Sequence, residues 1–170
     1  SKELCMHLNP LSPQERLGAL IRCCGSTKWA SLLNNAFPFS EDQELYNAAS
    51  SIWTAMDRED ILEAFSHHPQ IGADPEALRK KFKTTHTWSS NEQSGMSSAS
   101  EACIADLAKC NRLYLERFGY IFIVCATGKT AAQMLSLIKE RLHNPEEQEL
   151  KIAAAEQGKI TLLRLQKLIE

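Results

Sequence analysis

The chain has 170 residues, of which 44% are hydrophobic and 24% are charged, and its formal net charge is −2. This length fits one domain with a buried core. The near-neutral charge, with Lys and Arg dispersed among acids, argues against nucleic acid or an anionic membrane as a partner. No apolar run approaches the ~20 residues that span a bilayer. The first residues have no long apolar core, so we do not expect them to be a secretory signal.

The cysteines are predicted to be reduced, intracellular thiols. Six are present, and Cys23 and Cys24 are adjacent, which does not suit a Cys-x-x-Cys zinc or redox site. Cys103, Cys110 and Cys125 fall in apolar segments, where free cysteine behaves as a small hydrophobe. The histidines at positions 7, 86 and 143 lack metal-like spacing. We therefore expect no disulfide framework and no metal site.

Helix start signals recur along the chain. The first is Ser12-Pro13-Gln14-Glu15, a capping box with proline at the first helical position, which predicts a helix to about Cys24 that Gly25 ends. Further starts lie, in chain order, at Ser40, Asp57, Asp74, Ser98, Thr130 and Asn144. Gly119 is expected to end the long helix that begins at Ser98. Short joints between about seven to eight helices predict an all-α, single-domain irregular bundle.

Residues 120–126 break this pattern. The run Tyr-Ile-Phe-Ile-Val-Cys-Ala is apolar, β-branched and aromatic, which is typical of a strand. A lone buried strand would leave its N–H and C=O groups without a ladder. Two outcomes stay open: the segment is absorbed into a helix, or it stays extended and offers main-chain groups to a planar, amide-containing ligand.

The most informative single residue is His68, which precedes Pro69 where a helix is predicted to end. Proline disfavours the αR region for the residue before it, so His68 is expected just past the helix end, in extended geometry. The negative end of the helix dipole favours a protonated imidazole there. Because histidine titrates near neutral pH, His68 is a candidate proton donor. The alternative is an exposed turn histidine.

Two further features indicate a site. Ser89 and Glu92 have capping-box spacing, which places both at a helix N-terminus where N–H groups can receive ligand oxygens. The alternative is that Glu92 only caps this helix. Arg164 shares a helix face with Gln157 and Ile160. If it is buried, Arg164 needs a partner, which is either an internal carboxylate or a ligand carboxylate or ring carbonyl.

Four blocks, taken in this order, resemble the OHCU decarboxylase family. They are His68-Pro69-Gln70-Ile71-Gly72, Ser89-x-x-Glu92-Gln93, Phe118-Gly119-Tyr120-Ile121-Phe122 and Ile160-Thr161-Leu162-Leu163-Arg164. OHCU is 2-oxo-4-hydroxy-4-carboxy-5-ureidoimidazoline, an unstable product of urate oxidation. The resemblance runs from about Cys23 to the C-terminus and is closest to plant versions, which are typically fused to a transthyretin-like hydroxyisourate hydrolase. It implies one decarboxylase-like helical domain over residues 1–170, in which 1–22 have no placed counterpart.

The resemblance also implies roles for individual residues. His68 would be the catalytic acid/base and Glu92 its partner at the substrate. Where family members often carry arginine, this chain has Gln70, which has no proposed role. The implied substrate contacts are Pro69, Ser89, Ser90, Asn91, Glu92, Gln93, Phe122, Ile123, Val124, Cys125, Ala126 and Arg164.

The function implied is conversion of OHCU to (S)-allantoin in urate breakdown. No metal or organic cofactor is expected, because the electrons left by CO₂ can be delocalised in the substrate's own ring. The resemblance further implies a homodimer, a fused or associated hydroxyisourate hydrolase, and a peroxisomal location, with the cytoplasm as the alternative. Two other functions stay open: a non-catalytic helical interaction module, and a cofactor-free ring hydrolase acting on a ureide.

Overall fold

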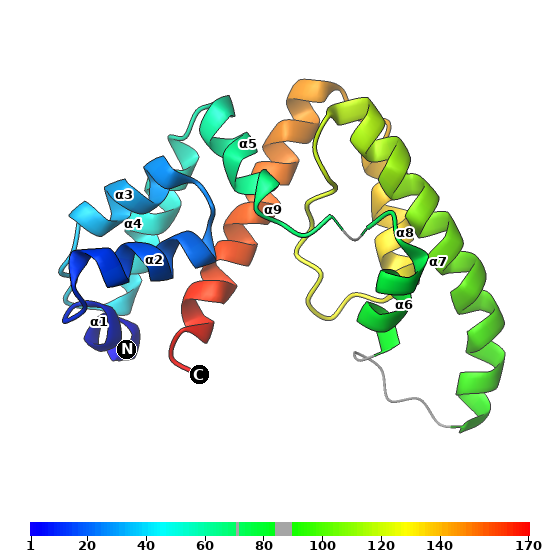
Figure 1. Cartoon of the computed structure of the whole chain (residues 1–170), viewed down its shortest axis with the longest axis horizontal. Coiled ribbons are helices and arrows are strands. Elements are labelled where there is room, and N and C mark those ends of the chain that lie inside the picture. Colours follow the sequence, from blue (N-terminus) through cyan, green and yellow to red (C-terminus); the bar gives the residue numbers. More distant parts are fainter. Residues whose placement is uncertain (71, 84–89) are drawn as a thin grey trace. The chain divides into compact units, whose positions relative to one another are not determined.

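The computed structural model describes residues 1–70, 72–83 and 90–170, and the side chains of these residues other than 83 and 90–100. Over these ranges the chain is all-helical, as predicted, with nine helices and no strand (Figure 1). They are α1 (Glu3–Leu8), α2 (Pro13–Cys23), α3 (Thr27–Asn35), α4 (Asp42–Thr54), α5 (Arg58–Ser66), α6 (Pro75–Lys83), α7 (Ser90–Phe118), α8 (Ala131–Arg141) and α9 (Glu146–Lys167). None of the described helices is long and apolar enough to cross a membrane.

The chain divides into two compact units. Unit 1 comprises Ser1–His68, Ile123–Cys125 and Ala154–Glu170, and unit 2 comprises Pro69–Phe122 and Ala126–Ala153. Helix α9 therefore supplies its first turns to unit 2 and the rest of its length to unit 1. The prediction of a single domain over residues 1–170 stays a prediction.

Unit 1 is built around two tryptophans. Trp29 of α3 is fully buried and its indole N–H donates to the carbonyl of Ala49 in α4 at 3.0 Å. Trp53 of α4 donates in the same way to the carbonyl of Ala154 in α9 at 2.8 Å. A Cβ at Gly158 would lie 3.4 Å from Cδ1 of Trp53, so the missing side chain lets α4 and α9 approach closely. These contacts attach the C-terminal part of α9 to the core of unit 1.

The N-terminus of unit 1 is held by one buried carboxylate. Asp42, at the start of α4, is 5% exposed. Its carboxylate accepts hydrogen bonds from the amides of Leu4 at 3.2 Å and Cys5 at 2.9 Å, and from the Ser1 hydroxyl at 3.0 Å. A residue distant in sequence thus satisfies amides at the start of α1 that have no partner within the helix.

In unit 2, α7 and α8 pack around a buried polar network. Glu149 of α9 is fully buried. Its carboxylate accepts from the Tyr114 hydroxyl, from Nε and Nη2 of Arg141 at 2.9 and 2.6 Å, and from the Asn144 amide at 3.0 Å. The Arg141 guanidinium also lies 4.4 Å from the ring centre of Phe122. The Glu149 carboxylate is thus paired with the Arg141 guanidinium inside unit 2.

Several predicted helix starts are confirmed. Ser12 accepts a hydrogen bond from the Glu15 amide at 3.2 Å, and Asp57 accepts one from the Asp60 amide at 3.2 Å. Thr130 and Gln133 form a complete reciprocal capping box at the start of α8. Gly119 ends α7 with φ +82°, a conformation that favours glycine. Ser40 is close to a start, but α4 begins at Asp42 without a side-chain cap from Glu41.

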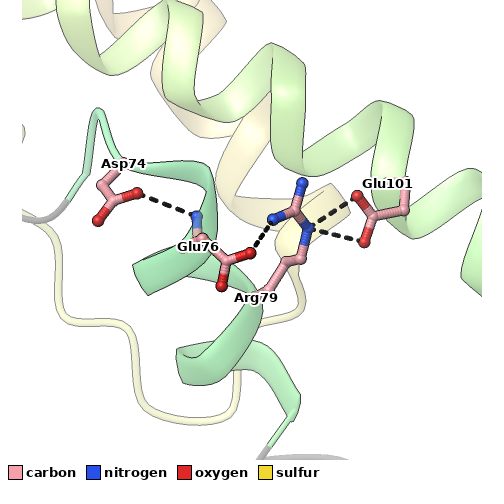
Figure 2. A network of polar contacts seen from close by, with 4 residues as sticks. All are labelled: Asp74, Glu76, Arg79 and Glu101. Atoms are coloured by element: carbon pink, nitrogen blue, oxygen red, sulfur yellow. Dashed lines mark hydrogen bonds and ion pairs between the residues drawn. The ribbon is translucent and has the colours of Figure 1, made fainter.

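The predicted start at Ser98 is wrong, because α7 runs continuously from Ser90 through this position. The carboxylate of Glu101, which suggested a capping box there, instead accepts from Nε of Arg79 in α6 at 2.8 Å (Figure 2). Arg79 also pairs with Glu76 of its own helix at 2.9 Å. Serine is tolerated inside a helix at a small cost in propensity, so the pattern alone did not separate a cap from a helix interior.

Residues 121–126 lie outside any helix and form no strand. Absorption into a helix, one of the two outcomes left open, is therefore wrong. Helices α1 and α3 were not predicted. The signal for α3 was present in the sequence: Ser26 accepts a hydrogen bond from the Trp29 amide at 3.3 Å and acts as its N-cap.

Candidate active site

His68 lies immediately after the C-cap of α5, as predicted. Helix α5 ends at Ser66 with His67 as its C-cap, and the His68 amide donates to the carbonyl of Phe65 at 3.2 Å. The His68 side chain is half-buried, whereas Pro69 is exposed. The imidazole is thus held at a helix end without being sealed from solvent.

Gln157 of α9 is the hydrogen-bond partner of the His68 ring. Its Oε1 lies 2.5 Å from Nε2 of His68. The other end of the same amide, Nε2 of Gln157, donates to Oγ1 of Thr161 at 3.1 Å, and the Thr161 hydroxyl donates to the Gln157 carbonyl at 2.9 Å. Gln157 is 0% exposed and Thr161 is 5% exposed. A buried polar chain in unit 1 therefore ends at a half-buried titratable group.

Arg164 lies on the same face of α9 as Gln157, as the helical spacing predicted, about two turns or roughly 10 Å further along. Its Nη1 lies 3.5 Å from the carbonyl oxygen of Cys23. Within the described ranges Arg164 forms no ion pair, so no internal carboxylate from this part of the chain neutralises it.

The adjacent thiols do not supply a nucleophile. Burial raises the pKa of the Cys23 thiol to about 11, although the nearby charge of Arg164 opposes this change. Burial also raises the pKa of Cys24, although the hydrogen bond from the Ser26 amide opposes this change. Both therefore remain protonated at neutral pH, and a thiol in that state is a poor nucleophile and metal ligand.

Gly25 positions the end of α5 in a way the sequence did not reveal. It was expected to end α2, but α2 ends at Cys23 with an extended Cys24, and Gly25 has no left-handed backbone. A Cβ at Gly25 would lie 2.4 Å from Cγ and 2.6 Å from Cβ of His67. Glycine is required here because the turn after α2 packs directly under the residue that precedes His68.

The segment Ile123–Cys125 belongs to unit 1, where its main chain meets α9. The amide of Cys125 donates to Oε1 of Glu156 at 3.1 Å, and Oε2 of Glu156 pairs with Lys159 at 2.6 Å. Val124 is half-buried in the same segment. Phe122 and Ala126 are assigned to unit 2, where the ring of Phe122 lies 5.3 Å from that of Tyr114.

The remaining predicted contacts cannot be placed beside these residues. Ser89 lies outside the described residues. Ser90, Asn91, Glu92 and Gln93 form the first turn of α7, but their side chains also lie outside the described part. Their proposed contacts with substrate stay predictions.

A hollow of about 270 Å³ also opens in unit 1, between α4 and α9. Trp53, Gly158 and Thr161 are among its lining residues, which are mostly apolar and include neither His68 nor Arg164. Across the described residues no group of three or more His, Cys, Asp or Glu side chains is arranged to hold a metal ion. We therefore assign the candidate site to the His68 and Arg164 side chains and not to this hollow.

The sequence model of the OHCU decarboxylase family matches residues 9–166. The chain belongs to the OHCU decarboxylase family. Among curated relatives it is 40% identical over 147 residues to the uric acid degradation bifunctional protein TTL of Arabidopsis thaliana, a match that covers 86% of this chain and 45% of that protein. It is also 33% identical over 104 residues to the 2-oxo-4-hydroxy-4-carboxy-5-ureidoimidazoline decarboxylase of Amia calva, covering 61% and 58% of the two chains.

Solved structures agree with this family assignment. A crystal structure of OHCU decarboxylase in the presence of (S)-allantoin matches with a TM-score of 0.68 and 39% identity, covering 88% of this chain and 95% of that one. An (S)-allantoin synthase shares the fold, with a TM-score of 0.69 at 18% identity. The chain spans less than half of the length of the bifunctional relative from Arabidopsis thaliana.

In this member of the OHCU decarboxylase family, sequence reasoning missed Gln157 and Thr161 as functional candidates. Gln157 was noted only as a neighbour of Arg164 on the helix face. Gln157, Thr161 and Arg164 are spaced so that they lie on one face of α9, and the fully buried Leu165 lies on the same face. Polar residues on a buried helix face were the signal in the sequence that could have indicated Gln157 and Thr161. The chemistry assembled in unit 1 is thus a titratable imidazole, a guanidinium and a short stretch of non-helical main chain.

Proposed function

We propose that this chain catalyses the decarboxylation of OHCU to (S)-allantoin, with His68 delivering the proton. Membership of the OHCU decarboxylase family and 39% identity to a decarboxylase crystallised in the presence of (S)-allantoin support the substrate and product. The single structural observation that carries the proposal is the placement of a half-buried imidazole and of Arg164, which forms no ion pair with the described residues, along one face of α9.

The substrate's structure sets what the protein has to do. The bond from the ring carbon to the carboxylate breaks, CO₂ leaves, and the electron pair moves into the ring towards its C=N group. The ring nitrogen takes up a proton, and the 4-hydroxyl loses one as it becomes the ring carbonyl, so these two changes cancel. One net proton is added to the carbon that bears the ureido group, and this step creates the chiral centre of allantoin. Because the ring itself accepts the electron pair, the proposed reaction uses no metal or organic cofactor. The protein's tasks are to orient the carboxylate, stabilise charge and protonate one face.

His68 suits the protonation step. A positioned general acid typically contributes ~10²–10⁴ in rate. The imidazole lies next to a helix C-terminus, whose dipole favours the protonated form from which a proton is donated. Delivery of that proton from a fixed side of the ring gives one enantiomer, whereas spontaneous decay of OHCU gives racemic allantoin.

Arg164 suits the charge that changes position during the reaction. A guanidinium can bind a carboxylate or a ring oxygen with two parallel hydrogen bonds. One well-placed donor to a developing negative charge is worth roughly 3–4 kcal/mol of barrier. Glu92 is proposed to orient His68 or to bind the ureido N–H groups, and Pro69, Ser89, Ser90, Asn91, Gln93 and the main chain of 122–126 are proposed to line the substrate site.

The setting of the enzyme is proposed on the same family basis. We infer that the chain acts as a homodimer, beside a fused or associated transthyretin-like hydroxyisourate hydrolase that supplies the preceding step. The proposed location is the peroxisome. The name of the Arabidopsis thaliana relative, a bifunctional protein of uric acid degradation, supports the pairing of two activities.

The test follows freshly generated OHCU by circular dichroism, with CO₂ release and product chirality measured together. The wild-type chain should accelerate CO₂ release and form (S)-allantoin, and His68→Asn should lose at least a hundredfold of this acceleration. His143→Asn, which changes an exposed histidine, is the control and should keep full activity. Ring-opened products without CO₂ would support the hydrolase alternative, and no acceleration by the wild type would support the interaction module. Full activity of His68→Asn would contradict the role of His68.

A further inference from the structure

A fully buried glutamine is the feature on which this inference rests. The Gln157 side chain is 0% exposed, so its amide oxygen and nitrogen must both find partners within the protein. The oxygen meets His68 and the nitrogen meets Thr161.

The orientation of this amide is set by Thr161. The Thr161 hydroxyl donates its one proton to the main-chain carbonyl of Gln157 at 2.9 Å. Its oxygen can therefore only accept from the Gln157 side chain, and an acceptor must face the NH₂ end of that amide. The opposite end, Oε1, is then directed at the His68 ring at 2.5 Å. Thr161 thus determines which atom of Gln157 meets the histidine.

This orientation determines the protonation pattern of the imidazole. An amide oxygen only accepts hydrogen bonds, so the ring nitrogen that faces it has to carry a hydrogen. Nε2 of His68 is consequently an N–H donor in both the neutral and the cationic ring. The proton that His68 gains or loses is the one on Nδ1.

We propose that Gln157 is a positioning residue that holds His68 in its Nε2–H form, with Thr161 as the anchor, so that the proton used in catalysis leaves from Nδ1. The catalytic part of this proposal rests on the proposed function, whereas the protonation pattern of His68 does not. Gln157 is itself neutral, so its oxygen favours the Nε2–H tautomer without adding an ion pair to the imidazolium.

The first experiment measures the tautomer without substrate. In the ¹⁵N-labelled chain of 170 residues, at a pH where His68 is neutral, long-range ¹⁵N–¹H spectra should show Nε2 as the protonated nitrogen and Nδ1 as the unprotonated one. Thr161→Val removes the anchor without touching His68 and should give shifts averaged between the two tautomers. Thr161→Ser keeps the hydroxyl and should restore the wild-type pattern. A protonated Nδ1 in the neutral wild-type ring, or unchanged shifts in Thr161→Val, would overturn the proposal.

The second experiment separates positioning from substrate binding. Gln157→Met keeps a similar volume but removes the amide, and its sulfur is only a weak acceptor. It should lower kcat for OHCU about tenfold to a hundredfold, because small misplacements of a catalytic group have effects of this size, and KM should change little. Gln166→Met, at an exposed position of the same helix, is the matched control. A raised KM with unchanged kcat would mean that Gln157 binds substrate and does not position His68. If the wild type fails to turn over OHCU, the proposed function fails, while the spectra still decide the tautomer.

Discussion

Helix α9 carries one fully buried polar residue in each unit, and the two are used differently. Glu149, in unit 2, is charged and is surrounded by Arg141, Tyr114 and Asn144. Gln157, in unit 1, is neutral and connects Thr161 to the half-buried His68. The first arrangement neutralises a charge entirely within the protein. The second reaches a half-buried imidazole, a side chain that can gain or lose a proton.

This difference separates polar residues that maintain the fold from those that prepare chemistry. A buried ion pair becomes costly when one partner is lost, because the other charge stays buried. The hydrogen bonds that link Thr161, Gln157 and His68 involve a neutral amide, so a substitution at Gln157 leaves no buried charge without a partner. Such a substitution should therefore alter the behaviour of His68 more than it alters the free energy of unfolding.

Glu149→Gln should give the largest loss of stability. The substitution leaves the 6% exposed Arg141 without its carboxylate, and breaking a buried pair in this way typically costs about 3–5 kcal/mol. Urea unfolding measures the loss. Glu147→Gln, an exposed change on the same helix, should alter the free energy of unfolding by less than about 0.5 kcal/mol. Similar values for the two variants would show that the unit 2 network does not stabilise the fold.

Arg164→Met should have the opposite profile. Its one hydrogen bond within the described residues, to the Cys23 carbonyl, is long at 3.5 Å, so we expect a change in unfolding free energy of about 1 kcal/mol or less. The value of kcat/KM for OHCU should fall about a hundredfold to a thousandfold, because the charge on the substrate loses its donor. Arg58→Met removes an exposed charge from the same unit and should leave both quantities near wild type. Equal activities of the two variants would exclude Arg164 from the site.

Gly25→Ala should disturb the end of α5 that carries His68. The new Cβ would lie 2.4 Å from Cγ of His67, and overpacking of this kind costs about 1–3 kcal/mol. We expect lower stability in urea together with lower activity. Gly18→Ala is the matched control: its Cβ would meet only Nη1 of Arg22 at an ordinary 3.5 Å, so it should stabilise α2 by up to about 1 kcal/mol. Wild-type activity of Gly25→Ala would show that this close approach does not position His68.

Asp42→Ala should give the smallest change, and one that depends on pH. Burial opposes ionisation of Asp42, but hydrogen bonds from Cys5, Leu4 and Ser1 outweigh it and lower the pKa of this carboxyl below its usual value. A lowered pKa in the folded state contributes stability above the unfolded pKa of about 3.9, and this contribution is lost as the pH falls through the folded value. The loss of these caps should cost about 0.5–2 kcal/mol near pH 6.

Urea titrations of wild type and Asp42→Ala at several pH values check this sign. The difference in unfolding free energy between them should shrink as the pH falls below about 4. A difference that stays constant down to pH 2 would show that the Asp42 contribution does not depend on its charge.

Local signals were enough to predict much of the fold. Helix starts at Ser12, Asp57 and Thr130 depend on side chains that bond amides a few residues away, and such bonds can be inferred from spacing. The error at Ser98 arose because the same spacing occurs inside a helix when the acidic residue has another partner. That partner, Arg79, is distant in sequence.

The site could be predicted only where it followed from local geometry. His68 was found because a histidine before proline at a helix end is unusual in the chain, and Arg164 because a lone arginine stood among aliphatic neighbours. The contact between His68 and Gln157 joins residues far apart in the sequence, and neither residue alone indicates it. Gly25 was singled out for a different reason from the one the structure supplies, since its role depends on His67 and not on its own backbone angles.

The indole of Trp53 has a consequence of practical value. Its N–H bonds the Ala154 carbonyl and its ring lies against Gly158, so its environment depends on whether the C-terminal half of α9 is seated on α4. Tryptophan emission shifts when an indole leaves such a contact for water. In a variant with Trp29 and Trp88 replaced by phenylalanine, Trp53 would be the one remaining tryptophan. Its fluorescence emission would then report whether the part of α9 that carries Gln157 and Arg164 separates from α4.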